Sequence, residues 1–254
     1  MARVRAAVLA AGRGVRMGGR RPKALIPLGD HEPTLAYLLR GIRRAGVDDV
    51  LIVTGFGAAE VQDYVASNFG DLDATYVFNA RYASWGNFHS LRMALEQSPG
   101  FDVLAVNCDV VVHPDVFRRV IDSEGDLVLA VQRRENLDAE DMRVELAGDR
   151  VRQIGKGLKM VRSHGEFAGV SLLRDRAAAL YQRMCTDLEW SADTAGYYED
   201  VYARMLADVD ARAATVGRGE YAEVDSPTDV VAAVRVVEEH WAGDRADASA
   251  EHRT

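Results

Sequence analysis

The sequence predicts an α/β fold: one doubly wound, mostly parallel sheet with a mixed C-terminal portion and a small β-hairpin. Three observations support this. The chain has 254 residues, 48% of them hydrophobic, which is enough to bury a substantial core. Short apolar runs alternate with helical patterns over the first half. No stretch rich in Pro, Gly or Ser divides the chain, so we expect one domain over 1–242, followed by a disordered tail at 243–254 that is small, charged and aperiodic.

Apolar runs and helical patterns alternate through the first 130 residues. The runs predict strands at 4–10, 50–54, 75–78, 103–107 and 127–131. Apolar residues at spacings of three and four predict helices at 34–45, 58–69, 87–97 and 114–122. Because the strands are apolar throughout, we expect helices on both faces of the sheet, joined to it by right-handed parallel crossovers.

The pattern changes after about residue 130. A turn at 147–150 separates two short strands, 142–146 and 151–154, which predicts a β-hairpin. The remaining elements are a strand at 167–173 and helices at 177–184, 197–207 and 227–241. This irregular order predicts the mixed C-terminal portion.

Composition excludes several classes of protein. With 31 basic and 39 acidic residues the formal charge is −8, so the chain lacks the overall positive field of a non-specific nucleic-acid binder. Cys108 and Cys185 are too few for a disulfide scaffold or a thiolate metal site, which fits a reducing cytosol. The apolar run at 6–11 is too short for a signal peptide or a membrane span. We therefore expect a cytoplasmic protein with a small-molecule partner, no nucleic acid and no membrane.

The sharpest feature is a glycine- and arginine-rich loop directly after the first strand. Four glycines leave backbone N–H groups free to approach an anion. Five cationic side chains fall within eleven residues: Arg13, Arg16, Arg20, Arg21 and Lys23. This concentration, at the end of a strand where α/β sheets bind ligands, predicts a polyphosphate site rather than a solvated surface turn.

Two common phosphate motifs do not fit the loop. A dinucleotide-binding fingerprint requires glycine where Met17 stands. A P-loop would continue from Gly19 with Lys and then Ser or Thr, whereas the chain has Arg20 and Arg21. The loop therefore belongs to neither class.

The run Leu-Ala-Ala-Gly-x-Gly-x-Arg-Met at 9–17, followed by Pro-Lys-Ala-Leu at 22–25, resembles the signature of nucleotidyltransferases that activate phosphorylated small molecules with a nucleoside triphosphate. The resemblance implies a Rossmann-like sheet of the GT-A type and a loop that wraps the triphosphate. It assigns Arg16 and Lys23 to stabilisation of the transition state. Nucleotide contacts are implied for Leu9, Ala11, Gly12, Arg13 and Gly14.

Two aspartates follow strands that we expect to end near this loop. Asp109 comes after the strand at 103–107, and Asp225 lies between a short strand and the closing helix. Carboxylates at one rim suit Mg²⁺, which prefers oxygen ligands, and the family likewise has one metal-binding Asp after a central strand and another before its last helix. Asp109 would also contact the nucleotide. Simpler alternatives are a turn role for Asp109 and capping of the last helix by Asp225 or Ser226.

Further segments, at 79–90, 138–144, 155–156, 165–169 and 197–202, resemble a narrower branch that contains the bacterial phosphocholine cytidylyltransferases and the phosphonate cytidylyltransferases. By position, Asn87 and Ser90 would line the nucleotide or acceptor site, and Lys156 would act in catalysis by neutralising phosphate. Acceptor contacts are expected from Trp85, Asp141, Glu166, Tyr198 and Asp200.

Structural roles remain open for the same residues. Trp85 could be a lid or core aromatic, and Asn87 and Ser90 could cap and pack a helix. Lys156 and Glu166 could form an ion pair across neighbouring strands. The acids around Asp141 could form a turn, and those at 199–200 a solvated helix face.

Together these features predict a Mg²⁺-dependent cytidylyltransferase that joins CMP from CTP to a small phosphorylated or phosphonate metabolite and releases pyrophosphate. Phosphocholine, 2-aminoethylphosphonate and phosphonoformate are the acceptors considered. The acceptor oxygen is already ionised near neutral pH, so the reaction needs no general base. The alternatives are a sugar-1-phosphate nucleotidyltransferase that uses UTP, GTP or dTTP, and a non-catalytic nucleotide-binding sensor. A homodimer is compatible with this reading.

Overall fold

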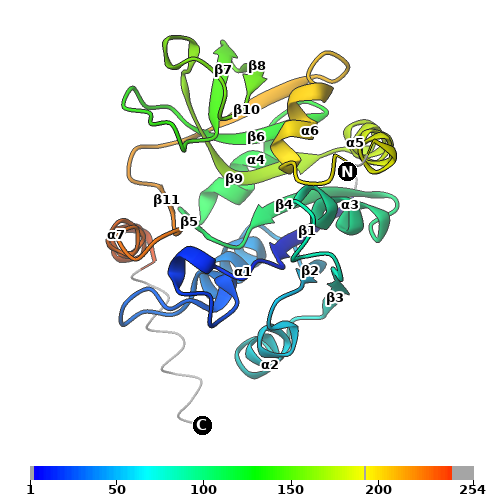
Figure 1. The fold of residues 1–254 in the computed structure, drawn as a ribbon. Helices are drawn as coiled ribbons and strands as arrows, with labels where there is room; N and C mark the ends of the chain where they lie inside the picture. The colour runs from blue at the N-terminus through cyan, green and yellow to red at the C-terminus, as the bar shows by residue number, and fades with distance from the viewer. Residues whose placement is uncertain (1–2, 192, 242–254) are drawn as a thin grey trace.

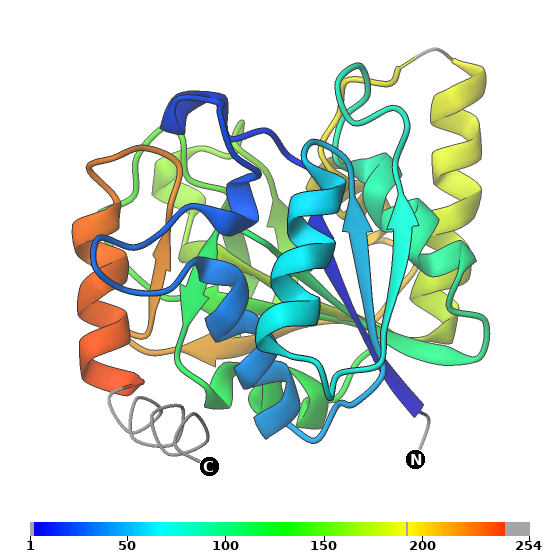
Figure 2. The same cartoon turned by 90° about the horizontal axis from the view of Figure 1, so that it is seen from below.

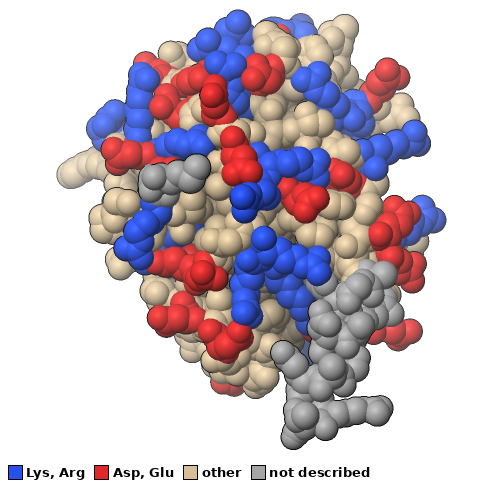
Figure 3. Space-filling view, turned by 180° about the vertical axis from the view of Figure 1, so that it is seen from behind, with Lys and Arg blue, Asp and Glu red and all other residues tan. Residues whose placement is uncertain are grey.

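The computed structural model describes residues 3–191 and 193–241. The tail expected at 243–254 lies outside the described residues. Within them, every helix is too short or too polar to cross a membrane. Figure 3 shows basic and acidic side chains lying next to one another over the face opposite to that of Figure 1.

The first half of the chain forms the parallel part of a nine-stranded sheet (Figure 1). Its order is β3-β2-β1-β4, and all three pairings are parallel. The bounds are β1 Arg3–Ala10, β2 Val50–Thr54, β3 Ala74–Phe78 and β4 Phe101–Asn107. In β1, Val8 lies beside Ile52 on one side and Val106 on the other, so the carboxyl ends of β1, β2 and β4 meet at one edge.

Helices cover both faces of the sheet, as expected. Buried side chains of α1, α2 and α4 share one core cluster with alternate residues of β1, and those of α3, α5 and α6 share a second cluster with the intervening residues of β1. The bounds are α1 Thr34–Arg44, α2 Ala58–Asn68, α3 Phe88–Glu96, α4 Asp115–Asp122, α5 Asp175–Trp190 and α6 Tyr198–Met205. Alternation between the two faces follows from the two-residue period of a strand.

The second half of the sheet is mixed. β9 lies between β4 and β6 and is antiparallel to both, while β10 runs parallel to β6. The hairpin β7–β8 pairs with β10 on one side and returns to β9 on the other, so five strands close into a ring. The bounds are β6 Leu127–Gln132, β7 Arg143–Ala147, β8 Arg150–Ile154, β9 Gly165–Leu173 and β10 Ala211–Val216. The expected mostly parallel sheet is therefore correct for the first half, whereas the second is largely antiparallel.

A small second sheet pairs β5, Val110–Val112, with β11, Tyr221–Glu223. Behind it packs α7, Val230–His240, which buries Trp241 at its end against Tyr37. Figure 2 shows α7 and α5 on opposite sides of the molecule. Because β5 directly follows Asp109 and β11 precedes Asp225, this sheet brings the two aspartates together.

Several elements differ from the sequence-based expectation. The strands β5 and β10 were not predicted, α5 is longer than expected, and α7 begins at Val230 rather than at Pro227. Three short 3₁₀ turns also appear, at Val15–Met17, Lys23–Leu25 and Met160–Arg162. The hairpin and the other helices and strands lie within a few residues of their predicted positions.

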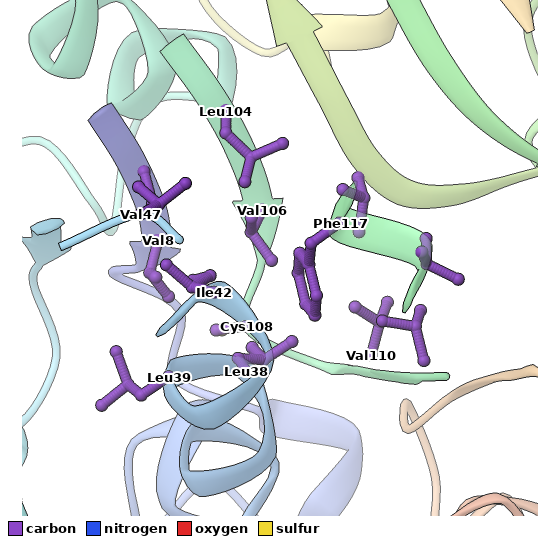
Figure 4. Close-up of a cluster of buried hydrophobic side chains, with 14 of the residues drawn as sticks. Val8, Leu38, Leu39, Ile42, Val47, Leu104, Val106, Cys108, Val110 and Phe117 are labelled. Atoms are coloured by element: carbon purple, nitrogen blue, oxygen red, sulfur yellow. The ribbon is translucent and has the colours of Figure 1, made fainter. Parts of the chain in front are cut away.

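The core beneath α1 supports one stability prediction. Gly41 faces the ring of Phe117, which lies among the buried side chains of Figure 4, and a Cβ at this position would also come within 3.2 Å of Trp241. Gly to Ala within a helix normally stabilises by roughly 0.5–1 kcal/mol. Overpacking costs about 1–3 kcal/mol, so we expect Gly41→Ala to lower the free energy of unfolding, measured by urea denaturation. The loss should shrink in a Phe117→Leu background. Unchanged or increased stability would contradict this packing.

Candidate active site

A cleft of about 610 Å³ lies at the edge where β1 and β4 end. It is bounded by the glycine-rich loop, the segment that begins α3, the ring of strands and the segment from β11 to α7. Thirteen of the residues predicted for the site line it: Leu9, Ala11, Gly12, Arg16, Lys23, Trp85, Asn87, Ser90, Asp109, Asp141, Lys156, Glu166 and Asp225.

The glycine-rich loop folds back on itself. Gly14 has a φ of 62° and Gly18 a φ of 95°, conformations that favour glycine. The carbonyl of Gly14 accepts hydrogen bonds from the N–H groups of Met17 and Gly19, and the Lys23 N–H donates to the Gly12 carbonyl at 3.1 Å. These bonds place Arg16 and Lys23 together at the cleft, although they lie seven positions apart in the sequence.

An ion network joins the loop to both aspartates. The Lys23 ammonium contacts Asp109 Oδ2 and Asp225 Oδ1, and the Arg16 guanidinium lies 2.7 Å from Asp225 Oδ2. Burial alone would lower the pKa of Lys23, but the two carboxylates outweigh it and raise that pKa above its ordinary value. The loop cations and the two predicted metal ligands therefore share one position.

Glu223 is a third carboxylate at this position, and it was not among the residues predicted for the site. Ligand oxygens of Asp109, Glu223 and Asp225 lie within 4.8 Å of one another. The signal that could have found it is its spacing, because side chains two residues apart share one face of a strand. Desolvation of its carboxyl group in the cleft, reinforced by the charges of Asp109 and Asp225, raises the pKa of Glu223 to about 8, although the residue as a whole is exposed.

The carboxylate cluster fits a hard divalent cation. Asp109 Oδ1 is buried and has no hydrogen-bond partner among the described residues. The oxygens that are satisfied at this position are satisfied by cationic groups, with Lys23 between the two aspartates. Mg²⁺ prefers oxygen ligands and is commonly held by one or two carboxylates, so Asp109 and Asp225, with Glu223 beside them, could hold it.

The wall near α3 is organised by hydrogen bonds among polar side chains. Asn79 donates to Ser90 Oγ at 3.0 Å, and Asn87 accepts a bond of 2.9 Å from the Tyr198 N–H. The ring of Trp85 stacks on Phe88, with ring centroids 6.0 Å apart. Asn87 therefore anchors the start of α6, while Trp85 and Ser90 contribute to the cleft wall.

Arg134 organises the opposite wall. One of its nitrogens lies 2.6 Å from Asp141 Oδ2 and 2.7 Å from Glu166 Oε2. Burial raises the pKa of Glu166 to about 7, although Arg134 opposes that rise. Lys156 pairs instead with Glu140 at 3.2 Å, so the alternative of an ion pair between Lys156 and Glu166 is wrong.

Four predicted site residues do not line the cleft. Arg13 donates to the Gly19 carbonyl at 3.0 Å, and Gly14 forms the turn described above. Tyr198 is buried and donates to Asn107 Oδ1 at 2.8 Å. Asp200 accepts the Tyr197 N–H at 2.7 Å in a capping box at the start of α6, which places it in a structural role.

The capping alternative for Asp225 is not what the structure shows. Asp229 Oδ2 accepts the N–H groups of Asp225 and Ser226, at 3.1 and 2.7 Å, and thereby organises the turn before α7. The side chain of Asp225 is left to face Lys23 and Arg16.

Glu199 gives a testable pH dependence. It lines the cleft, it is 5% exposed, and its Oε2 has no partner among the described residues. Burial raises the pKa of Glu199 to about 8, so the folded protein keeps a proton that the unfolded chain, with an ordinary pKa near 4.3, releases. Protein stability therefore falls as pH rises between these two values.

We expect Glu199→Gln, which mimics the neutral acid, to gain stability over the unmodified protein as pH rises from 5.5 to 8.5. Urea denaturation at both pH values measures the gain, with Glu124→Gln as an exposed control that should show little change. A gain that does not grow with pH would contradict the protonated state of Glu199.

Comparison with known proteins agrees with this geometry. A family model described as a MobA-like NTP transferase domain matches residues 6–235. Over 133 residues the chain is 34% identical to the CMP-5'-(3-aminopropyl)phosphonate synthase of Streptomyces rubellomurinus, which covers 51% of this chain and 21% of that protein. Over 118 residues it is 30% identical to the choline-phosphate cytidylyltransferase of Streptococcus pneumoniae, covering 45% of this chain and 48% of that protein. The matched segments thus span about a fifth and about half of these relatives.

A solved structure extends the likeness to nearly the whole chain. The inositol-1-phosphate CTP transferase from T. maritima superposes with a TM-score of 0.78 at 19% identity, covering 94% of this chain and 98% of that one. The described fold is therefore an α/β nucleotidyltransferase fold.

Proposed function

The chain belongs to the MobA-like NTP transferase domain family and is a nucleotidyltransferase, and we propose that it transfers CMP from CTP to a small phosphorylated or phosphonate acceptor and releases pyrophosphate. The observation that carries this proposal is the convergence of Arg16, Lys23, Asp109 and Asp225 in one cleft at the end of the glycine-rich loop. The cytidylyl specificity rests on the similarity to proteins whose names specify CMP or cytidylyl transfer.

The proposed reaction is an in-line displacement at the α-phosphorus of CTP. An oxygen of the acceptor forms a new bond to that phosphorus, the bond to the bridging oxygen breaks, and its electron pair leaves with pyrophosphate. The acceptor oxygen is already ionised near neutral pH, so no side chain has to remove a proton. What the protein must supply is alignment of two anionic reactants and compensation of their repulsion.

This chain's own residues fit that requirement. The loop backbone at Gly12 and the side chains of Arg16 and Lys23 present positive charge to one end of the cleft. Asp109 and Asp225, with Glu223 beside them, would hold Mg²⁺, which when bound supplies further positive charge to the phosphates. Lys156 lines the other end of the cleft, where it would neutralise the acceptor phosphate or phosphonate.

The acceptor end of the cleft favours an acceptor that carries an ammonium group. Carboxyl side chains outnumber cations in this part of the cleft: Asp138, Glu140, Asp141 and Glu166 line it against Arg134 and Lys156. This excess of acid would repel the carboxylate of phosphonoformate and attract an ammonium group, as in phosphocholine or 2-aminoethylphosphonate. The names of the two relatives, an aminopropylphosphonate synthase and a choline-phosphate cytidylyltransferase, point to the same chemistry.

Turnover measurements test the proposal. CTP, UTP, GTP and dTTP would each be combined with phosphocholine, 2-aminoethylphosphonate, phosphonoformate or glucose 1-phosphate in the presence of Mg²⁺. Pyrophosphate release and ³¹P NMR of the product would be followed, with omission of the acceptor as a control for hydrolysis. We expect CTP with an ammonium-bearing acceptor to react fastest. Preference for glucose 1-phosphate with UTP or dTTP would show a sugar nucleotidyltransferase instead. If none of the acceptors gave pyrophosphate release, the assignment would be contradicted.

A further inference from the structure

Lys23 occupies the position between the two proposed metal ligands. Its ammonium group contacts one oxygen of Asp109 and one oxygen of Asp225, and the side chains of all three residues are mostly shielded from solvent. The second oxygen of Asp225 is taken by Arg16 at 2.7 Å, whereas Asp109 Oδ1 has no partner among the described residues. Three of the four aspartate oxygens that a cation would use are therefore already paired.

A divalent ion and the Lys23 ammonium cannot both use these oxygens. An ion bound to Asp109 and Asp225 would lie next to a positive charge, and at such short range in a half-buried site this repulsion is substantial. For the ion to bind well, Lys23 has to leave both carboxylates. The flexible four-carbon stem of a lysine allows such a movement.

A bound triphosphate would offer Lys23 a partner away from the carboxylate cluster. Lys23 and Arg16 line the cleft together with Gly12 and the end of β1. A triphosphate held by the loop would bring anionic oxygens to this end of the cleft and would draw both cations from Asp225. The triphosphate would thereby free the aspartate oxygens for the ion, and the ion would offset the repulsion between the aspartates and the triphosphate.

We propose that the Lys23 ammonium occupies and blocks the metal position in the nucleotide-free protein. A divalent ion then binds weakly by itself, and it binds cooperatively with the triphosphate. This inference rests on the proposed function, because it concerns the same site. By thermodynamic reciprocity, the nucleotide tightens the ion as much as the ion tightens the nucleotide. The enzyme would thereby take up the metal with its nucleotide rather than before it.

The test measures Mn²⁺ binding to the nucleotide-free protein, using the EPR signal of free Mn²⁺. Lys23→Met removes the charge at nearly unchanged length, and Lys23→Gln is a second neutral variant in case the first does not fold. Both are expected to bind Mn²⁺ on the order of tenfold more tightly than the unmodified protein, since a competing ion pair has been removed. Lys23→Arg keeps the charge and should bind Mn²⁺ as weakly as the unmodified protein.

Two controls distinguish blockage of the metal position by Lys23 from the effect of any positive charge in the cleft. Lys156→Met removes one positive charge from the same cleft but away from the aspartates, and it should leave Mn²⁺ affinity nearly unchanged. Adding Asp109→Asn to Lys23→Met should abolish the tighter binding. Equal or weaker Mn²⁺ binding by both neutral variants, equal tightening by Lys156→Met, or tight binding that survives Asp109→Asn would each overturn the inference.

The outcome is independent of the turnover experiment. Mn²⁺ binding is measured without CTP or acceptor, so turnover in the absence of tightening contradicts only the role of Lys23. Tightening in the absence of turnover with any nucleotide contradicts only the proposed function.

Discussion

Asp109→Asn is expected to lower kcat/KM for the proposed cytidylyl transfer by about a thousandfold. A bound metal ion stabilises the charge on the phosphates in the transition state by several kcal/mol, and each ~1.4 kcal/mol is a factor of ten in rate. Asp109 contributes a ligand oxygen to the carboxylate cluster, and its Oδ1 has no partner among the described residues. The amide keeps the shape of the side chain and removes its charge. Steady-state pyrophosphate release at saturating Mg²⁺ measures the loss.

CTP binding by Asp109→Asn should survive in weakened form, since the loop and the α3 wall are intact, and equilibrium dialysis would measure it. The matched control is Asp122→Asn, which removes a carboxylate from the exposed end of α4, where it pairs with Arg118. Near-normal turnover by Asp109→Asn, or an equal loss in the control, would remove Asp109 from the mechanism.

Arg16→Ala is expected to lower kcat/KM by about a hundredfold, the magnitude typical for loss of one preorganised donor to transition-state charge. The Arg16 side chain is 64% exposed and its guanidinium lies 2.7 Å from Asp225, so its removal leaves no cavity in the core. We therefore expect thermal stability to change little while turnover falls. Arg16→Lys should retain part of the activity, because it keeps the charge but loses the planar fork of donors.

Arg118→Ala serves as the control for Arg16→Ala, because it removes an exposed arginine of α4 that lies in an i,i+4 ion pair away from the cleft. It should react at the normal rate. If Arg16→Ala retained full kcat/KM at limiting CTP, the loop would bind phosphate without this side chain.

The sequence predicted the fold well where the apolar residues follow a single strand or helix pattern. The apolar run at 50–54 coincides with β2, which is buried at every residue. β10 escaped prediction because Ala211–Val216, with three alanines and an arginine, has little of the β-branched and aromatic character that marks strands, and it forms because β6 lies beside it. Likewise, periodicity identifies β9 as a strand but does not encode its antiparallel position between β4 and β6.

Some features of the candidate site could likewise be predicted from the sequence, and others could not. The prediction that Asp109 lies near the glycine-rich loop could be made because β1 and β4 are parallel and their carboxyl ends share an edge. Asp225 reaches the same position through the small antiparallel sheet of β5 and β11, and its prediction rested on the family resemblance. Pairings between distant segments could not be read in this way. The link from Arg134 to Glu166 depends on the turn of the chain after β6, and the capping role of Asp200 depends on where α6 begins.

The ring of β9, β6, β10, β8 and β7 bears on which part of the cleft could change its specificity independently of the rest. β9 belongs both to the ring and to the main sheet, so the wall that carries Glu166 is braced against the strand that ends near Asp109. The hairpin β7–β8 is remote from the glycine-rich loop in the order of strands. The segments that flank this hairpin carry Asp141 and Lys156, so changes in them would alter the acceptor end of the cleft and leave the loop that carries Arg16 and Lys23 as it is.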